Sequence, residues 1–160
     1  MQGCVNLGAM YGGGRGVAQS EPLAAEFIRR ACAGGDMEGC ANLGWAYENG
    51  RGVPQSDTRA VVLYRRACDA GEMGGCGLLG LMYSKGHGVP QSDTLAVELY
   101  RRACDGGNMA GCWRLGSMYR DGRGVAQSDD RAVELFQAAC DGGHSESCDL
   151  LRRASPGVRP

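Results

Sequence analysis

The sequence lacks the features that mark several common classes of protein. Its formal net charge is −1, so we expect no basic face for nucleic acid or for an anionic membrane surface. No apolar run approaches the roughly 18 residues that a membrane-spanning helix needs, so no membrane insertion is expected. No secretory signal peptide is visible at the amino terminus.

Residues that commonly carry catalysis are also scarce. Lys85 is the only lysine and does not stand three positions after a serine, so the Ser-x-x-Lys motif of serine β-lactamases is absent. His87 and His144 are the only histidines, and they lie far apart in the sequence. A metallo-hydrolase would need clustered histidines and carboxylates. We therefore predict a non-enzymatic protein without metal or cofactor.

Cysteine, in contrast, is abundant, and its spacing reveals a repeat array. Eight of the nine cysteines form pairs whose members are eight positions apart, and each pair lies 36 residues from the last. The pairs are Cys32 and Cys40, Cys68 and Cys76, Cys104 and Cys112, and Cys140 and Cys148. A fixed period of this length indicates units that pack mainly on their neighbours.

Each unit contains the signals for two helices. In the third copy an apolar stripe predicts a first helix over about 73–84, and the glycines and proline of 86–90 break it. Ser92 is a natural N-cap for a second helix, which Gly106 and Gly107 end by supplying the left-handed position after it. The same N-cap signal recurs at Ser20, Ser56 and Ser128.

A glycine recurs inside every first helix, although glycine costs about 1 kcal/mol there relative to alanine. The repetition predicts close approach of a neighbouring helix, with a recurring alanine as the opposing small residue. The glycines are Gly8, Gly44, Gly80 and Gly116, and the alanines are Ala24, Ala60, Ala96 and Ala132.

The cysteine pairs favour disulfides in an oxidising compartment. The first cysteine of each pair is expected in the last turn of one helix and the second in the first turn of the next, so a bridge would close a helical hairpin. Zinc sites usually space two cysteines as C-x₂₋₄-C, whereas here the spacing is C-x₇-C; a metal site and free thiols remain the alternatives. One bridge across so short a loop contributes about 2.5 kcal/mol, which would help an array with 28 glycines and 6% aromatic residues to stay folded.

The ends of the chain depart from the pattern. Residues 1–4 align with residues 37–40, so we interpret the start as the middle of a repeat and Cys4 as a free thiol whose partner would lie upstream. A dimer through Cys4 or through the uncapped amino-terminal end is possible. We expect a single solenoid over 1–154, with a truncated last copy, and a flexible tail over 155–160.

The repeated motifs resemble a known family. The segments 41–53 (ANLGWAYENGRGV) and 57–67 (DTRAVVLYRRA) are similar to Sel1-like repeats, a branch of the tetratricopeptide-type solenoids, and the C-x₇-C pairs resemble the cysteine-rich subgroup first known from Helicobacter. This resemblance implies an all-α, right-handed α-α superhelix with one disulfide per hairpin, acting as a protein-interaction scaffold. A bacterial periplasmic or secreted location is expected, with the mitochondrial intermembrane space as the alternative.

A second function stays open beside the scaffold. Some cysteine-rich members of the family are described as penicillin-binding proteins or β-lactamases. The alternative is therefore a protein that binds β-lactams or peptidoglycan fragments with weak or no hydrolysis. Turnover of nitrocefin would distinguish the two.

A protein or peptide partner is expected on the inner face of the array, which the first helices line. Positions that differ between the copies are not needed for stacking, and both tryptophans fall among them; tryptophan and arginine are common interface anchors. The candidate partner-binding residues are Asn42, Trp45, Leu78, Leu81, Lys85, Trp113, Arg114 and Ser117. The alternative is that these are ordinary solvated positions, with the tryptophans partly covered by neighbours.

Two further patterns are given structural interpretations. The paired arginines of the second helices, such as Arg65 and Arg66, share those helices with acidic residues and indicate a solvated outer face. The Gly-Arg-Gly loops at 50–52 and 122–124 are interpreted as helix breaks, because no strand precedes them as in a phosphate-binding loop.

Overall fold

The computed structural model describes residues 2–14 and 16–154, and all regular structure in these ranges is helical. The expected flexible tail over 155–160 lies outside the described residues. The helices are α1 Gln2–Gly13, α2 Glu21–Ala33, α3 Met37–Asn49, α4 Asp57–Asp69, α5 Met73–Lys85, α6 Asp93–Asp105, α7 Met109–Asp121, α8 Asp129–Asp141 and α9 Ser145–Ala154. None of these described helices combines the length and the apolarity that crossing a bilayer requires.

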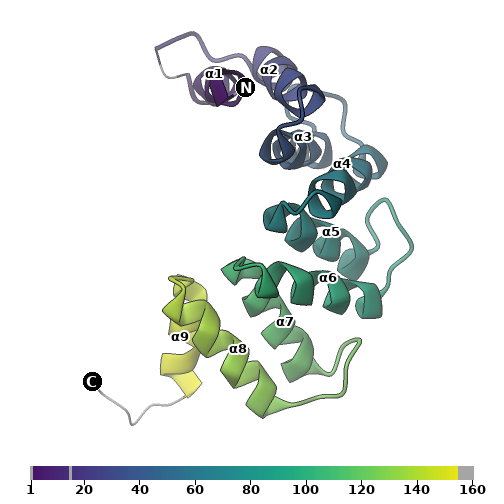
Figure 1. Ribbon diagram of the computed structural model, residues 1–160, viewed down its shortest axis with the longest axis vertical. Coiled ribbons are helices and arrows are strands. Elements are labelled where there is room, and N and C mark those ends of the chain that lie inside the picture. Colours follow the sequence, from purple (N-terminus) through teal and green to yellow (C-terminus); the bar gives the residue numbers. More distant parts are fainter. Residues whose placement is uncertain (1, 15, 155–160) are drawn as a thin grey trace.

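The helices form a solenoid in which each packs on the next along the chain. Figure 1 shows them following an arc, with α1, α3 and α5 on its inner side and α2 and α4 outside them. First helices of neighbouring repeats also touch, α3 with α5 and α5 with α7. The predicted all-α repeat array is confirmed, and its first helices α3, α5 and α7 form a continuous inner surface.

Local signals fix where the helices begin and end. The four predicted serine N-caps each accept a hydrogen bond from a backbone N–H three residues ahead, at 3.3–3.4 Å, which satisfies a donor that the helix itself leaves free. The first helix of the third copy runs one residue further than predicted, to Lys85, before Gly86 takes a left-handed conformation. Gly107 has a φ of +87° directly after the C-cap of α6, as predicted.

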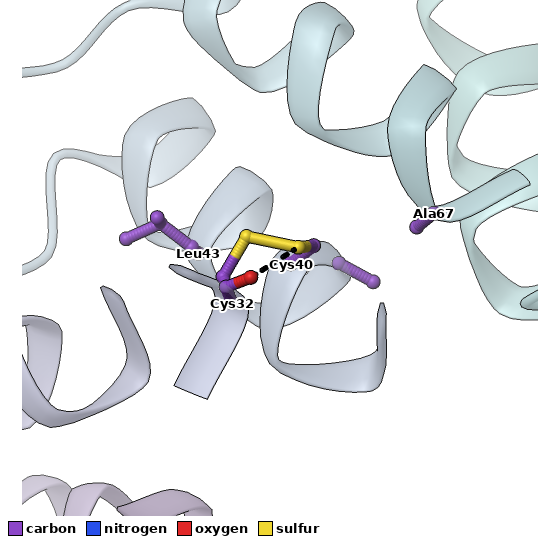
Figure 2. Close-up of a cluster of buried hydrophobic side chains, with 5 residues drawn as sticks. Cys32, Cys40, Leu43 and Ala67 are labelled. Carbon is purple, nitrogen blue, oxygen red and sulfur yellow. Dashed lines mark hydrogen bonds between the residues drawn. A yellow bond between two sulfur atoms is a disulfide. The ribbon is translucent and has the colours of Figure 1, made fainter. Parts of the chain in front are cut away.

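A disulfide closes each of the four predicted cysteine pairs. The Cα atoms are 4.5 Å apart in three bridges and 4.8 Å in Cys140–Cys148. Figure 2 shows the first bridge joining Cys32 at the end of α2 to Cys40 at the start of α3, beside Leu43. Both sulfur-bearing residues are buried in a cluster that includes Ala67 of the next repeat. The first two bridges, Cys32–Cys40 and Cys68–Cys76, are thus part of the buried core of the array.

The recurring glycines of the first helices mark the predicted close approach. A Cβ on Gly80 would lie 2.8 Å from a ring carbon of Tyr100, which is itself only 2% exposed. Equivalent contacts at 2.7–2.8 Å occur between Gly8 and Ile28, Gly44 and Tyr64, and Gly116 and Phe136. The prediction is confirmed, but the closest atoms belong to a large side chain of the second helix rather than to the expected alanine.

Because only one of them faces a neighbouring ring, Gly80 and Gly77 of α5 are expected to respond in opposite directions to substitution by alanine. Gly80→Ala is expected to lower the free energy of unfolding by about 1–2 kcal/mol, because overpacking a fixed ring outweighs the better helix propensity of alanine. Gly77→Ala, in the same helix, is expected to raise it by up to about 1 kcal/mol, since its nearest side-chain atoms would be 3.7 Å or more away. Urea midpoints of the two variants measure both shifts, and an equal response would contradict the close approach.

The loop after each first helix packs on the previous repeat. Gly88 has a φ of +69°, and a Cβ there would lie 2.6 Å from the carbonyl carbon of Asp57 at the start of α4. In the neighbouring copies Arg51 forms an ion pair with Glu21 at 2.7 Å and Arg123 with Asp93 at 2.7 Å. These contacts couple consecutive repeats at one edge of the array.

A second arginine contact crosses the repeat boundary on the other edge. The Nη2 of Arg102 donates a hydrogen bond to the carbonyl oxygen of Cys68 at 2.7 Å. This carbonyl belongs to the last turn of α4, where backbone acceptors lack helical partners. At least one of the paired arginines therefore caps a neighbouring helix besides facing water.

Candidate functional site

Two pockets lie along the first helices, and they are two repeats apart. The N-terminal pocket, of about 380 Å³, is lined by Gly8, Ala9, Gly12, Gly13, Glu21, Ala24, Ala25, Ile28, Asn42, Trp45, Ala46 and Arg51. The central pocket, of about 260 Å³, is lined by Leu81, Ser84, Lys85, Tyr100, Trp113, Arg114, Ser117, Met118 and Arg123. We call the surface that runs from one to the other the inner groove.

The two pockets are the same structural position in different copies. Subtracting two repeat lengths from the residue numbers of the central pocket gives, for eight of its nine residues, a residue that lines the N-terminal pocket. In both, the walls come from the first helices of successive repeats and the floor from the second helix between them. The fold therefore builds a pocket at this position, and the side chains of each copy determine its chemistry.

The N-terminal pocket is mainly apolar. Ala24 and Ala25 are buried in its floor, and the indole of Trp45 is 44% exposed on its wall. The guanidinium of Arg51 lies 5.3 Å from the centroid of that ring and is paired with Glu21. The charges of this pocket thus cancel, and its open surface can accept an apolar side chain.

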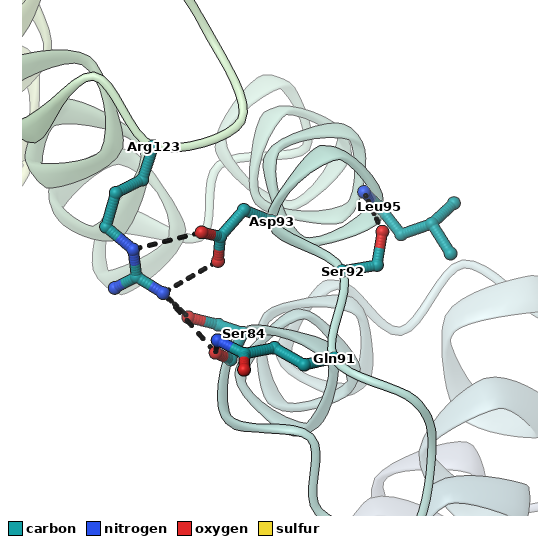
Figure 3. A network of polar contacts seen from close by, with 6 residues as sticks. All are labelled: Ser84, Gln91, Ser92, Asp93, Leu95 and Arg123. Carbon is teal, nitrogen blue, oxygen red and sulfur yellow. Dashed lines mark hydrogen bonds and ion pairs between the residues drawn. The ribbon is translucent and has the colours of Figure 1, made fainter.

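The central pocket is basic. None of its lining residues is acidic, and three are cations: Lys85, Arg114 and Arg123. Figure 3 shows Arg123 reaching to Asp93, with bonds of 2.7 and 3.1 Å, and to the hydroxyl of Ser84 at 3.3 Å. Among the described residues, no ion pair involves Lys85 or Arg114, so two positive charges remain uncompensated.

Tyr100 of the central pocket and the equivalent Tyr64 of the preceding repeat have different polar neighbours. Burial raises the pKa of Tyr100, while the neighbouring Arg114 acts to lower it. One repeat earlier, the hydroxyl of Tyr64 donates to Glu48 at 2.7 Å; burial and then this bond raise the pKa of Tyr64. Glu48 stands one repeat before Ser84 and places a carboxylate between the two pockets.

The tryptophans occupy different environments. Trp113 stacks on His144 of the following turn, with ring centroids 5.5 Å apart, and Arg114 lies 5.4 Å from its ring. Its Nε1 is buried and has no hydrogen-bond partner in the described part of the chain. Trp113 therefore forms a fixed wall, whereas Trp45 presents a face to the groove.

Seven of the eight predicted partner-binding residues line one of the two pockets. Asn42 and Trp45 belong to the N-terminal pocket, and the central pocket contains Leu81, Lys85, Trp113, Arg114 and Ser117. Leu78 lines neither pocket; it packs, partly buried, on the cluster that includes Ala60 and Leu79. Binding of a partner by these residues stays a prediction.

The polar pocket residues that the sequence-based prediction missed include Ser84, Tyr100, Arg51 and Arg123. The interpretation of the Gly-Arg-Gly loops as helix breaks explains their glycines and gives the two arginines no role. The available signal was their recurrence two repeats apart, each matched by an acidic residue 30 positions earlier.

The chain also carries potential metal ligands and a thiol outside the bridges. No group of three His, Cys, Asp or Glu side chains that could hold a metal ion occurs in residues 2–14 and 16–154. Cys4 lies half-buried in α1 as a free cysteine.

Comparison with known proteins agrees with this architecture. Residues 2–36, 38–72, 75–108 and 110–144 match the family described as Sel1 repeat. An antigen from uropathogenic Escherichia coli strains, c5321, has a TM-score of 0.83 and 31% identity over 99% of this chain and 35% of its own. A Sel1 repeat protein from Oxalobacter formigenes has a TM-score of 0.88 and 25% identity over 94% of this chain and 62% of its own.

A cysteine-rich protein of known structure is also similar to this chain. Cysteine-rich protein B of Helicobacter pylori has a TM-score of 0.66 and 26% identity over 82% of this chain and 95% of its own. The present chain spans about a third of the length of the Escherichia coli antigen and less than two thirds of the Oxalobacter protein. No curated protein is significantly similar in sequence.

Proposed function

The chain belongs to the Sel1 repeat family, and on this premise we propose that it is a non-enzymatic scaffold that binds an extended protein segment along the inner groove. Sel1 repeat proteins are generally protein-interaction scaffolds. A solenoid of this kind presents a long, continuous surface that suits an extended ligand.

One observation carries the proposal. The positions that hold the repeats together stay nearly constant, as with the four glycines of the first helices, while several equivalent positions in the two pockets differ in chemistry. Trp45 corresponds to Ser117, and Asn42 corresponds to Arg114. The fold places a pocket at this position in both copies, and the change in lining chemistry from copy to copy suits a ligand with different groups along its length.

The disulfides support an oxidising location for this function. Four bridges join the helical hairpins, and such bonds persist mainly outside the reducing cytosol. We place the protein in a periplasmic or extracellular environment, where its partner would also have to reside.

Trp45→Ala is the direct test of the groove. Immobilised wild-type protein captures a partner from the extracytoplasmic proteins of the source organism, and calorimetry then measures the affinity of that partner for each variant. We expect Trp45→Ala to weaken binding by about thirtyfold, which corresponds to about 2 kcal/mol for a central aromatic anchor. Trp45 is the better choice than Trp113, because Trp113 also packs on His144.

The matched control lies on the outer face. Val62 is 63% exposed on α4, so Val62→Ala should leave the affinity unchanged. If the partner bound Trp45→Ala as tightly as the wild type, and lost affinity only for the Val62 variant, the inner groove would not be the binding surface.

A further inference from the structure

We propose that the segment held in the groove is acidic at one end and aliphatic at the other. An aspartate or glutamate side chain occupies the central pocket, and an aliphatic side chain occupies the N-terminal pocket about six residues away. The inference rests on the proposed function and adds to it the chemical class of the partner and its register on the array.

Charge complementarity assigns the carboxylate to the central pocket. Lys85 and Arg114 line it without an ion-pair partner among the described residues, and the positive charge of Arg123 is shared with Asp93. Ammonium and guanidinium groups offer only hydrogen-bond donors. A carboxylate supplies acceptors alone, and a guanidinium can bind it through two parallel hydrogen bonds.

The surroundings favour one carboxylate over a polyanion. The carboxylate of Glu48 faces the same groove one repeat earlier, where it is held by the hydroxyl of Tyr64. Asp93 is bonded to Arg123, which lines the pocket, and Asp121 is bonded to Arg120. A nucleic acid or a run of acidic residues would bring further negative charge against Glu48, whereas a single acidic side chain avoids it.

The N-terminal pocket cannot take the same group. At the positions of Lys85 and Arg114 it carries Gly13 and Asn42, and its one arginine is neutralised by Glu21. The exposed indole of Trp45 and the buried Ala24 and Ala25 leave an apolar surface. An aliphatic side chain buries its area there without separating Arg51 from Glu21.

The spacing follows from the solenoid geometry. Packed helices are about 8–10 Å apart, so two repeat steps along the first helices amount to about 20 Å. An extended chain advances about 3.3 Å per residue, so the two anchors lie about six residues apart. The pocket walls are contributed by successive repeats rather than by a closed end, so an internal side chain fits better than a chain terminus.

Peptide selection on the oxidised protein tests the inference. The library displays random peptides that are long enough to reach both pockets, and selected peptides are resynthesised with amidated carboxyl ends. Wild-type protein is expected to enrich sequences with Asp or Glu about six residues from Leu, Ile or Val. Changing the acidic residue of a selected peptide to its amide should weaken binding by about tenfold, and added salt should reduce that difference.

Charge reversal in the protein gives the sharper comparison. Lys85→Glu/Arg114→Glu is expected to enrich Lys or Arg in place of the acidic residue. Arg65→Glu/Arg101→Glu makes the same change of charge on exposed second-helix positions and should select the wild-type sequences. Circular dichroism confirms that each variant is folded, and Lys85→Gln/Arg114→Gln replaces the reversal if that variant is not.

The outcomes separate the two proposals. Selected peptides without an acidic preference, or unchanged selection by the charge-reversed protein, would overturn the acidic assignment and leave the scaffold function standing. Failure of the wild type to enrich any peptide would overturn both. If Trp45→Ala selects peptides that keep the acidic residue but lack the aliphatic one, and the wild type selects peptides with both, the assignment of both pockets is supported.

Discussion

Reducing the disulfides is expected to unfold the protein at ambient temperature. Each bridge closes a loop of the same short length, with a sequence separation of eight, and contributes about 2.5 kcal/mol by restricting the unfolded chain. Together they contribute about 10 kcal/mol, whereas a whole domain is usually stable by only about 5–15 kcal/mol. The 28 glycines of the sequence add to the entropy that folding must overcome.

Urea titrations followed by helical circular dichroism, with and without a reductant, measure this effect. The double variant Cys68→Ala/Cys76→Ala removes one bridge and should lower the free energy of unfolding by about 2.5 kcal/mol. Cys4→Ser is the control, because Cys4 belongs to none of the bridges; it should respond to reductant as the wild type does. An array that kept its midpoint after complete reduction would show that packing alone holds the hairpins together.

Gly88→Ala is expected to cost about 3 kcal/mol and to uncouple two repeats. Its φ of +69° is unfavourable for alanine, by about 1–2 kcal/mol. The added methyl would also meet the backbone of Asp57 and Thr58 at 2.6–2.8 Å, and a helix backbone cannot yield as a flexible side chain can. Overpacking of this kind adds about 1–3 kcal/mol.

Gly71→Ala separates the conformational cost of a positive φ from the cost of overpacking. Gly71 has a φ of +90°, but a Cβ there would have nothing within 4 Å. It should therefore show the conformational cost of about 1–2 kcal/mol alone. Because repeat arrays depend on nearest-neighbour interfaces, Gly88→Ala should also broaden the urea transition. Equal losses in the two variants would mean that the loop at 86–90 does not couple the repeats.

The sequence alone predicts the helices of this fold well, because their ends depend on local chemistry. Ser92 caps α6 through its own side chain, and Gly86 and Gly107 take the conformations that end their helices. The partner of Gly80 was harder to predict, since it depends on the rotation of one helix against the next. That rotation places the ring of Tyr100, rather than Ala96, closest to the glycine.

The site could be predicted only in part for a related reason. Variation between copies drew attention to Trp45 and Arg114, which line the two pockets, but it could not show which variable side chains share a pocket. His144 covers Trp113 from the turn after α8, 31 positions later in the same repeat, and Arg123 enters the central pocket from a loop. Both contacts depend on how segments that are distant in the sequence pack together, which a comparison of equivalent positions does not reveal.

The placement of the disulfides has a mechanical consequence. Every bridge lies within eight residues of sequence, and none joins one bridge-bearing turn to another. A force pulling on the two ends of the chain would pass through the sulfur atoms and bypass the turns between them. Each repeat would then lengthen by roughly 25 Å less than its residue count allows, while neighbouring repeats stay free to separate one at a time. Under load, each disulfide would keep its turn closed while the helices outside the bridges unfold.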